Sequence, residues 1–346
     1  DVAKAAKQAI DNTNGITESE KQAAKSQVDN DAKAAKGAIG QAKSNKAVTD
    51  AVNNGTVAID KVSANAAIDG AAKTKDDAID ASNLTAEEKG ALKQTVAGEV
   101  NKAKGNIDAA TKDADVTTAQ TSGEKDINAV EIPTSSKTKN DANKEIESTA
   151  DAAKNAIDQT SGLTADQKQT AKKQIDQAVT DAQENIKKAS DNQGVADAKD
   201  AGKLAIDKVS EKAAIDDALA KKIEEIKANT NLTAEEKAKL TTDANSAAND
   251  AKDKIQSATT NDGATQAGKD GKTAIEGVTV PTDSDVKKNA NSDLDNTATA
   301  AKNAIDQTSG LTADQKQTAK KQIDQAVTDA QENIKKASDN QGVADA

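Results

Sequence analysis

Small apolar residues recur along the chain at spacings of three and four residues, with polar or charged residues between them. This spacing places the apolar residues on one face of an α-helix, because the helix turns once every 3.6 residues. No segment shows the strict alternation of a half-buried β-strand. Two representative stripes are Leu92, Val96, Val100, Ala103, Ile107 and Ala110, and Ala171, Ile175, Ala178, Ala182, Ile186 and Ala189. The pattern predicts an all-α protein.

A seven-residue motif, here called the anchor motif, occurs five times. The copies are GITESEK at 15–21, NLTAEEK at 83–89, GLTADQK at 162–168, NLTAEEK at 231–237 and GLTADQK at 310–316. They are separated by 68, 79, 69 and 79 residues, so two alternating units form a super-repeat of 147 or 148 residues. The stretch SGLTADQKQTAKKQIDQAV, which begins at Ser161, accordingly returns unchanged at Ser309. Self-similarity at this period predicts a tandem array of small helical units.

The anchor motif has the pattern of a helix start. Its threonine stands three residues before Glu or Gln, as Thr85 stands before Glu88, and this is the spacing of a capping box. Gly or Asn precedes the threonine by two residues, where we expect a left-handed residue to end the preceding helix. We therefore expect one helix to end, and another to begin, within about three residues. The new helix should run for about 26 residues.

A second joint follows this helix, and then comes a shorter helix that contains a glycine in every copy. These glycines are Gly55, Gly123, Gly202 and Gly271. The stripe around them is Val48, Ala51, Gly55, Ile59 and Val62 in one copy, and Val195, Ala198, Gly202, Ile206 and Val209 in another. Glycine in a helix costs roughly 1 kcal/mol relative to alanine, so its regular return suggests the close approach of another helix. A tolerated glycine on an exposed face is the alternative.

The third joint has two forms, which account for the alternating unit length. VSANAAID at 62–69 and VSEKAAID at 209–216 contain no helix breaker, so one helix could run into the next. VEIPTSS at 130–136 and VTVPTDS at 278–284 contain the only two prolines, Pro133 and Pro281. Proline followed by Thr and by Ser or Asp should stop one helix and cap another. We expect the helix after the proline form to be about ten residues longer, or roughly three turns.

The fold predicted from these elements is a series of spectrin-like three-helix bundles joined end to end into an elongated rod. Thin stripes of Ala, Ile and Val would leave an isolated helix marginal in water, so the stripes must pack against one another. The expected units are 1–62, 63–130, 131–209, 210–278 and 279–346, of which the first is truncated at its N-terminal end and the last in its third helix. A rod of four to five units would be on the order of 150–200 Å long.

Composition leaves little material for chemistry. The chain has no Phe, Tyr, Trp, Met, Cys or His, and all of its basic residues are lysines. The absence of histidine and cysteine removes the commonest general base, the thiolate nucleophile and the usual zinc ligands. We therefore nominate no catalytic, cofactor-binding or metal-binding residue, and we expect neither enzymatic activity nor a cofactor.

The net charge of −11 disfavours binding to nucleic acid, and the chain has no basic stripe and no aromatic platform for bases. No apolar run approaches the roughly 18–20 residues that span a bilayer. We expect a monomer with no small-molecule substrate, no nucleic-acid partner and no membrane insertion. The chain begins without a signal peptide, and we expect it to be a segment of a longer protein.

Two stretches resemble ligand loops. GATQAGKD at 263–270, with GKT following at 271–273, approaches a phosphate-binding loop, but Asp270 stands where Ser or Thr is required and no strand precedes it. Asp113, Asp115, Thr117 and Glu124 fall at calcium-loop positions, but Thr118 stands where the sharp turn of that loop requires Gly. We therefore interpret the first stretch as a helix joint and expect no calcium site at the second.

Three pairs of neighbouring like charges could in principle take part in chemistry, namely Glu87–Glu88, Glu224–Glu225 and Lys172–Lys173. We interpret all three as solvated surface charge, because the chain has no aromatic or bulky side chain to desolvate a carboxylate and shift its pKa. Asn83 and Asn231 lie in NLT sequons, which matter only in a host that glycosylates the protein.

The anchor motifs, together with the AAID or AIDQ helix ends before them and the NIxxA end of the long helix (Asn185–Ala189), carry a family resemblance. They resemble the three-helix repeats of unknown function in giant Gram-positive surface proteins, such as the staphylococcal extracellular-matrix-binding and biofilm-associated types. The resemblance covers essentially the whole chain. It implies a secreted, cell-wall-attached fibril whose repeats hold an adhesive region away from the cell.

The expected function is therefore a structural stalk that could lengthen under tension. The first alternative is a helical module that binds a host protein such as albumin, immunoglobulin or fibronectin, or another copy in a biofilm. The absence of Trp, Tyr and Arg weakens this alternative, because these residues dominate protein-binding hot spots. A largely disordered chain rich in Ala and Lys is the second alternative.

Overall fold

The computed structural model describes all residues from 1 to 346, and every regular element in it is an α-helix. The helices are α1 (Val2–Asn12), α2 (Glu18–Gln41), α3 (Asn45–Asp80), α4 (Ala86–Ala109), α5 (Asp113–Ala129), α6 (Lys137–Asp158), α7 (Ala165–Lys188), α8 (Asn192–Ala228), α9 (Ala234–Ser257), α10 (Asn261–Glu276), α11 (Asp285–Gln307), α12 (Ala313–Lys336) and α13 (Asn340–Asp345). The all-α prediction is confirmed.

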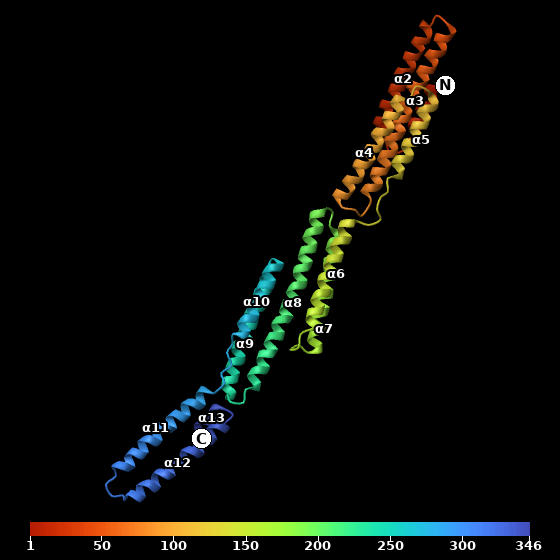
Figure 1. Cartoon of the computed structure of the whole chain (residues 1–346). Helices are drawn as coiled ribbons and strands as arrows, with labels where there is room; N and C mark the ends of the chain where they lie inside the picture. Colours follow the sequence, from red (N-terminus) through yellow and green to blue (C-terminus); the bar gives the residue numbers. More distant parts are fainter. The chain divides into compact units, whose positions relative to one another are not determined.

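The chain divides into two compact units, and each is described by itself. The first unit comprises residues 1–144 with 184–198, and the second comprises residues 145–183 with 199–346. Within the first unit, α1, α2 and α3 pack against one another, and α3 then continues to pack with α4 and α5 (Figure 1). The 36-residue α3 passes through 62–69 without interruption, as the absence of a helix breaker predicts. One helix thus belongs to two successive bundles.

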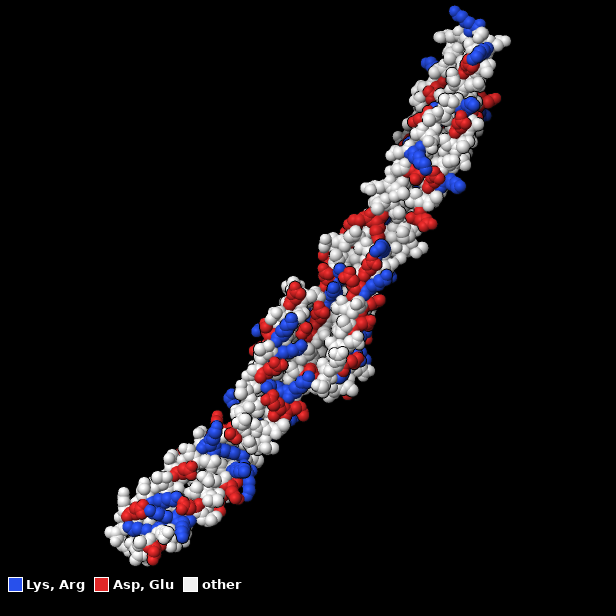
Figure 2. Space-filling view, in the orientation of Figure 1, with Lys and Arg blue, Asp and Glu red and all other residues white.

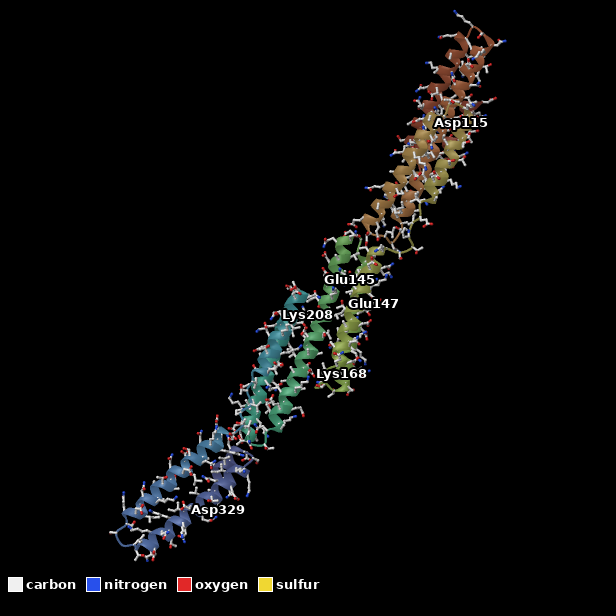
Figure 3. All side chains as sticks on the ribbon, viewed as in Figure 1. Asp115, Glu145, Glu147, Lys168, Lys208 and Asp329 are labelled. Atoms are coloured by element: carbon white, nitrogen blue, oxygen red, sulfur yellow. The ribbon has the colours of Figure 1, made fainter.

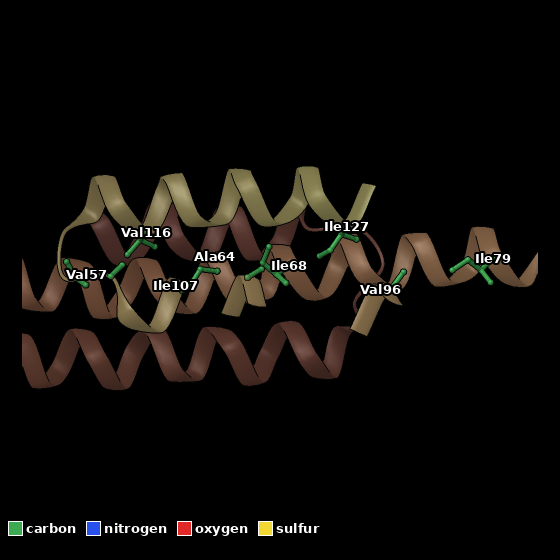
Figure 4. Close-up of a cluster of buried hydrophobic side chains, with 10 residues drawn as sticks. Val57, Ala64, Ile68, Ile79, Val96, Ile107, Val116 and Ile127 are labelled. Carbon is green, nitrogen blue, oxygen red and sulfur yellow. The ribbon is translucent and has the colours of Figure 1, made fainter. Parts of the chain in front are cut away.

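The core of the second of these bundles is a column of isoleucines with smaller residues between them. Ile68 of α3, Ile107 of α4 and Ile127 of α5 have no exposed surface and come from three different helices (Figure 4). Ala64, Ala103 and Val116 fill the remaining space. The isoleucines are the largest fully buried side chains of this aromatic-free core, and each contributes roughly 1.5–3 kcal/mol by its burial.

The four helix glycines lie where two helices approach closely, which confirms the prediction. A Cβ atom added to any of them would stand less than 3.0 Å from the Cβ of an alanine on the neighbouring helix. The pairs are Gly55 with Ala35, Gly123 with Ala103, Gly202 with Ala182 and Gly271 with Ala251. Each glycine therefore sets the spacing of two helices in its bundle.

The second unit repeats this arrangement. Ile215 of α8 lies in one core with Ala251 of α9 and Ile275 of α10. The 37-residue α8 runs without interruption through 209–216, as the sequence predicts for this form of joint. Towards the end of the chain, α11, α12 and α13 pack against one another.

The capping boxes are present at all five anchor motifs. In the first, the Thr17 hydroxyl accepts from the Glu20 backbone N–H, and the Glu20 side chain accepts from the Thr17 backbone N–H. The helices that begin at the anchor motifs are α2, α4, α7, α9 and α12, and each has 24 residues, close to the expected length.

The predicted left-handed helix terminators are wrong at four of the five anchor motifs. Only Gly15 has a positive φ, at 88°. The residues without one are Asn83, Gly162, Asn231 and Gly310. Hydroxyl groups take over part of the terminating role, because they donate to the open carbonyls at a helix end. The Ser82 hydroxyl, for example, donates to the Ile79 carbonyl at 2.7 Å. The connection is also longer than expected, with five residues between α1 and α2.

Two further expectations need correction. The helices after the prolines, α6 and α11, have only 22 and 23 residues, because most of the additional residues form the connections at 130–136 and 277–284. Val48 is exposed, whereas Val195 at the same place in another copy is buried. The short α1 packs around Ile59 and Ala66. Val48 lies about three helical turns before Ile59, so it is beyond the part of α3 against which α1 packs.

Candidate functional site

The two stretches that resemble ligand loops are helical. Residues 263–270 lie in α10, where Gly268 faces the side chain of Glu211 on α8. Residues 113–124 lie in α5, and Asp115 projects from that helix at an exposed position (Figure 3). A helix spreads such residues around its axis, so neither stretch forms the backbone cradle that a phosphate or a calcium ion requires. No group of three or more acidic, His or Cys side chains is placed to hold a metal ion.

Within the acidic pair Glu87–Glu88, Glu87 is exposed as predicted, but the interpretation as solvated surface charge is wrong for Glu88. Glu88 is partly buried at the proline connection between α5 and α6, residues 130–136, here called the first proline joint. Its Oε2 accepts from the Thr85 backbone N–H at 3.0 Å and completes the capping box of α4. Its Oε1 accepts from the Thr138 backbone N–H at 3.0 Å and from the Thr138 hydroxyl at 3.2 Å. One carboxylate therefore caps two helices, α4 and α6.

Glu87 and Ala86 extend the contact to a third helix. Glu87 Oε2 accepts from the backbone N–H of Asn192, the first residue of α8, at 2.8 Å. The Ala86 N–H donates to the Ser190 carbonyl just before α8, also at 2.8 Å. The N-termini of α4, α6 and α8 thus converge on two carboxylates. Negative charge is favourable there, because each helix presents unpaired N–H groups and the positive end of its dipole.

Hydrogen bonding dominates the ionisation of Glu88. Burial alone would raise the pKa of Glu88, but hydrogen bonds from the Thr138 and Thr85 backbones and from the Ser136 and Thr138 hydroxyls outweigh it and lower the pKa to about 2. The carboxylate is therefore charged throughout the physiological pH range.

The second proline joint, residues 277–284 between α10 and α11, repeats this geometry 148 residues further along. Glu236 Oε2 accepts from the Thr233 N–H at 2.9 Å, and its Oε1 accepts from the Val286 N–H at 3.3 Å. Glu235 accepts from the Asn340 N–H at 2.9 Å. Burial would raise the pKa of Glu236, but the hydrogen bonds from Thr233, Ser284 and Val286 lower it overall. The cluster is thus a recurrent feature of the fold.

The two other charged pairs are at the surface. Glu225 forms an ion pair with Lys222 at 2.8 Å and remains half-exposed, while Glu224 is exposed on α8. Lys172 reaches Asp158 at 2.7 Å, and Lys173 is exposed. Here the interpretation as surface charge agrees with the structure.

Asp60 of α3 is a further perturbed carboxylate, and it lies beside Asp113 at the N-terminus of α5. Burial raises the pKa of Asp60 first, and the neighbouring Asp113 carboxyl raises it further, to about 7. At the equivalent place in the second unit, Asn261 replaces the second acid, and its side-chain amide donates to Asp207 at 2.6 Å. The expectation that nothing in this chain could shift a carboxylate pKa is therefore wrong, because helix packing alone desolvates Asp60.

Shallow grooves recur beside the uninterrupted helices α3 and α8. One groove of about 420 Å³ has Leu163, Val209 and Ala213 among its lining residues, and the Lys252–Asp216 ion pair borders it. A smaller one of about 290 Å³ is lined in the same way by Ile16, Val62 and Ala66. Both place small apolar groups beside polar ones, but neither contains an aromatic or arginine side chain.

The surface mixes both signs of charge. Lysine and acidic side chains alternate along the face seen in Figure 2, and no large area of a single sign appears there. Ion pairs such as Lys199–Glu145, at 3.1 Å, link neighbouring helices across this surface. None of the helices has the length and apolar character needed to cross a membrane.

Comparisons with known proteins agree with the repeat pattern. The family model described as Domain of Unknown Function (DUF1542) matches residues 1–66, 60–135, 138–213, 207–283 and 286–346, which is nearly the whole chain. No solved structure matches the chain.

Curated relatives are very long proteins. Extracellular matrix-binding protein EbhA of Staphylococcus aureus (strain Newman) is 30% identical over 273 residues, which is 75% of this chain and 8% of that protein. Extracellular matrix-binding protein ebh of the strains NCTC 8325 / PS 47 and COL is equally similar, and the match covers 3% and 2% of those proteins. The chain therefore spans only a small part of the length of these relatives.

Proposed function

Because the chain belongs to the DUF1542 family, whose repeats occupy almost all of it, we propose that it forms part of the stalk of a bacterial cell-surface protein. In this function the repeats act as a spacer that projects a binding region of the parent protein away from the cell. The uninterrupted helices α3 and α8 carry the proposal, because each passes from one bundle into the next and stiffens the link between them.

The repeat units of this stalk are residues 1–62, 63–130, 131–209, 210–278 and 279–346, arranged end to end. A spacer should resist unspecific adhesion, and the mixed charges with few exposed large apolar side chains fit that requirement. The chain is monomeric and non-enzymatic in this proposal.

The names of the relatives support the proposed location. Proteins named for binding extracellular matrix act outside the cell, so we place the chain at the cell wall of a Gram-positive bacterium. Matrix or serum proteins of the host would then bind other parts of the parent protein.

Small-angle X-ray scattering of the full chain tests the stalk directly. An end-to-end array should give a maximum dimension of about 150–200 Å, because each long helix of 24 residues adds about 36 Å of length. A compact globule of this size would have a radius of gyration of about 20 Å. A value near 20 Å would refute the stalk.

The recurrent groove supports a second candidate function, which is binding of a host protein through a helix face. Surface plasmon resonance of the full chain over immobilised fibronectin, albumin and immunoglobulin tests it. If the groove binds, Gln174→Arg, which changes a lining residue, should weaken the signal at least tenfold. The exposed Gln169, outside the groove, gives the matched control Gln169→Arg, which should leave the signal unchanged. Absence of binding to all three proteins would eliminate these partners.

A further inference from the structure

The two versions of the anchor motif coincide with the two kinds of joint. The anchor motifs NLTAEEK at 83–89 and 231–237 contact the first and second proline joints. The anchor motifs GITESEK at 15–21 and GLTADQK at 162–168 lie instead against the uninterrupted helices α3 and α8. The acidic pair is thus found only where the next helix begins anew after a loop.

The number of acceptor atoms explains why glutamate is needed at the proline joints. A carboxylate has two acceptor oxygens, whereas a Gln side chain has one acceptor oxygen and an NH2 group that only donates. Glu88 uses one oxygen for its own capping box and the other for the Thr138 N–H. Gln167 spends its only acceptor oxygen on the Thr164 N–H, at 2.8 Å. Glutamine can therefore cap its own helix but has no second oxygen to direct at a helix of the next repeat.

The uninterrupted joints place a different demand on the anchor motif. A helix that passes through the joint has no free N–H groups there, so no second acceptor is needed. Close contact with its backbone is needed instead, and glycine at the first anchor position allows it. A Cβ on Gly162 would lie 2.8 Å from the Asp217 carbonyl oxygen, and one on Gly15 would lie 2.7 Å from that of Gly70. The Gly162 N–H also donates to the Asp217 carboxylate at 2.6 Å.

From these contacts we infer that the anchor motif selects the type of repeat that docks against it. The acidic pairs Glu87–Glu88 and Glu235–Glu236 form an interface for a repeat whose first helix starts after a proline loop. Their partner is the end of that repeat, where two helix N-termini present free N–H groups. The Gly-containing anchor motifs accept a repeat whose first helix passes through the joint. Glu87 and Glu88 are thus the residues that determine which type of following repeat can dock against this anchor motif.

A swap between the two natural anchor motifs tests this inference in the full chain. The double variant Glu87→Asp with Glu88→Gln gives the sequence TADQK, which already caps α7 at Thr164, so the start of α4 should remain helical. The matched control is the reverse swap, Asp166→Glu with Gln167→Glu, at an anchor motif beside an uninterrupted helix. Each variant replaces one natural anchor sequence by the other, so each keeps a Thr and a Glu or Gln at the capping-box positions.

The first readout is amide hydrogen exchange at single residues, measured by NMR. In the swapped variant, exchange of the Thr138 and Asn192 N–H groups should accelerate about tenfold or more, as expected for the loss of hydrogen bonds to a charged acceptor. The second readout is the distance distribution between spin labels. The cysteine-free chain allows labelling at Ala97→Cys and Lys188→Cys, both exposed positions within the first unit. This distribution should broaden in the swapped variant.

The reverse swap should change neither the label distances nor the exchange of the Gly162 N–H. Wild-type exchange and wild-type label distances in the Glu87→Asp, Glu88→Gln variant would overturn the inference, because the two anchor motifs would then be interchangeable. An equal effect of both swaps would overturn it as well, since the acidic pair would then have no particular relation to the proline joint.

Discussion

The close contact between Gly123 and Ala103 makes a sharp prediction about the substitution Gly123→Ala. The added methyl group on α5 would stand less than 3.0 Å from the Cβ of Ala103 and 2.8 Å from the Cδ1 of Ile68. The Ile68 side chain could rotate away. The Cβ of Ala103 cannot, because it is fixed to the backbone of α4, so α4 and α5 would have to separate.

Two opposing effects decide the magnitude. Alanine favours the helix over glycine by about 1 kcal/mol. Overpacking a well-packed core costs about 1–3 kcal/mol, and a clash with a backbone-fixed methyl group belongs in the upper part of that range. We therefore expect Gly123→Ala to lower the free energy of unfolding of its bundle by about 1–2 kcal/mol.

The same helix pair provides a matched control with the opposite sign. Gly98 lies in the interior of α4, and a Cβ there would meet no atom within 4 Å. Only the helix preference then acts, so Gly98→Ala should stabilise the protein by up to about 1 kcal/mol.

Native-state hydrogen exchange of α4 and α5 in the full chain is the appropriate assay, because an array of repeats need not unfold in one step. The exchange-competent opening of these helices should become easier in Gly123→Ala and harder in Gly98→Ala. Adding Ala103→Gly to Gly123→Ala should restore much of the loss, because the methyl group is then only moved to the other helix. Stabilisation by Gly123→Ala would refute the argument, since the helices would not be in close contact.

Three further predictions follow from single contacts. Ile107→Ala should cost about 2–5 kcal/mol of unfolding free energy, whereas Val52→Ala, at a position that is 44% exposed, should stay within about 0.5 kcal/mol. Native-state hydrogen exchange of the helices around each position distinguishes them. Thr85→Ala should lower the free energy of unfolding by about 1–2 kcal/mol and speed amide exchange in the first turn of α4. Thr312→Ala, at an exposed capping box, should have a smaller effect. Equal effects of the two substitutions would show that burial at the joint is irrelevant. The pKa of Asp60, raised to about 7, means that the folded state holds this proton more tightly than the unfolded chain, so stability declines as the pH rises from about 4 to about 7. Asp113→Asn should remove part of this decline and unfold at a higher temperature than the wild type at pH 8 but not at pH 3; identical melting curves at both values would contradict it.

Local sequence patterns predicted most of the fold. The stripe around Ile107 predicted its burial, the Thr85–Glu88 spacing predicted a capping box, and the return of Gly123 predicted a close helix contact. All three depend on residues within a few helical turns, for which the rules of helix geometry are sufficient.

The proline joints could not be predicted in the same way. Glu87 bonds to Asn192, which lies 105 residues further along the chain, and no local rule connects the two. The sequence did contain one usable signal, because Glu–Glu occurs in the two anchor motifs beside the proline joints and in none of the other three. Asp60 was missed for a similar reason: its partner Asp113 comes from another helix.

The passage of α3 and of α8 from one bundle into the next has a mechanical consequence. If tension disrupts one bundle of such a pair, the shared helix loses its packing partners in that bundle. The second bundle, which contains the rest of the same helix, should then unfold soon after. The chain would then lengthen in large, infrequent steps of two bundles each. Between such events the molecule would keep its length. It would therefore extend in discrete steps above a threshold force and not continuously with the load.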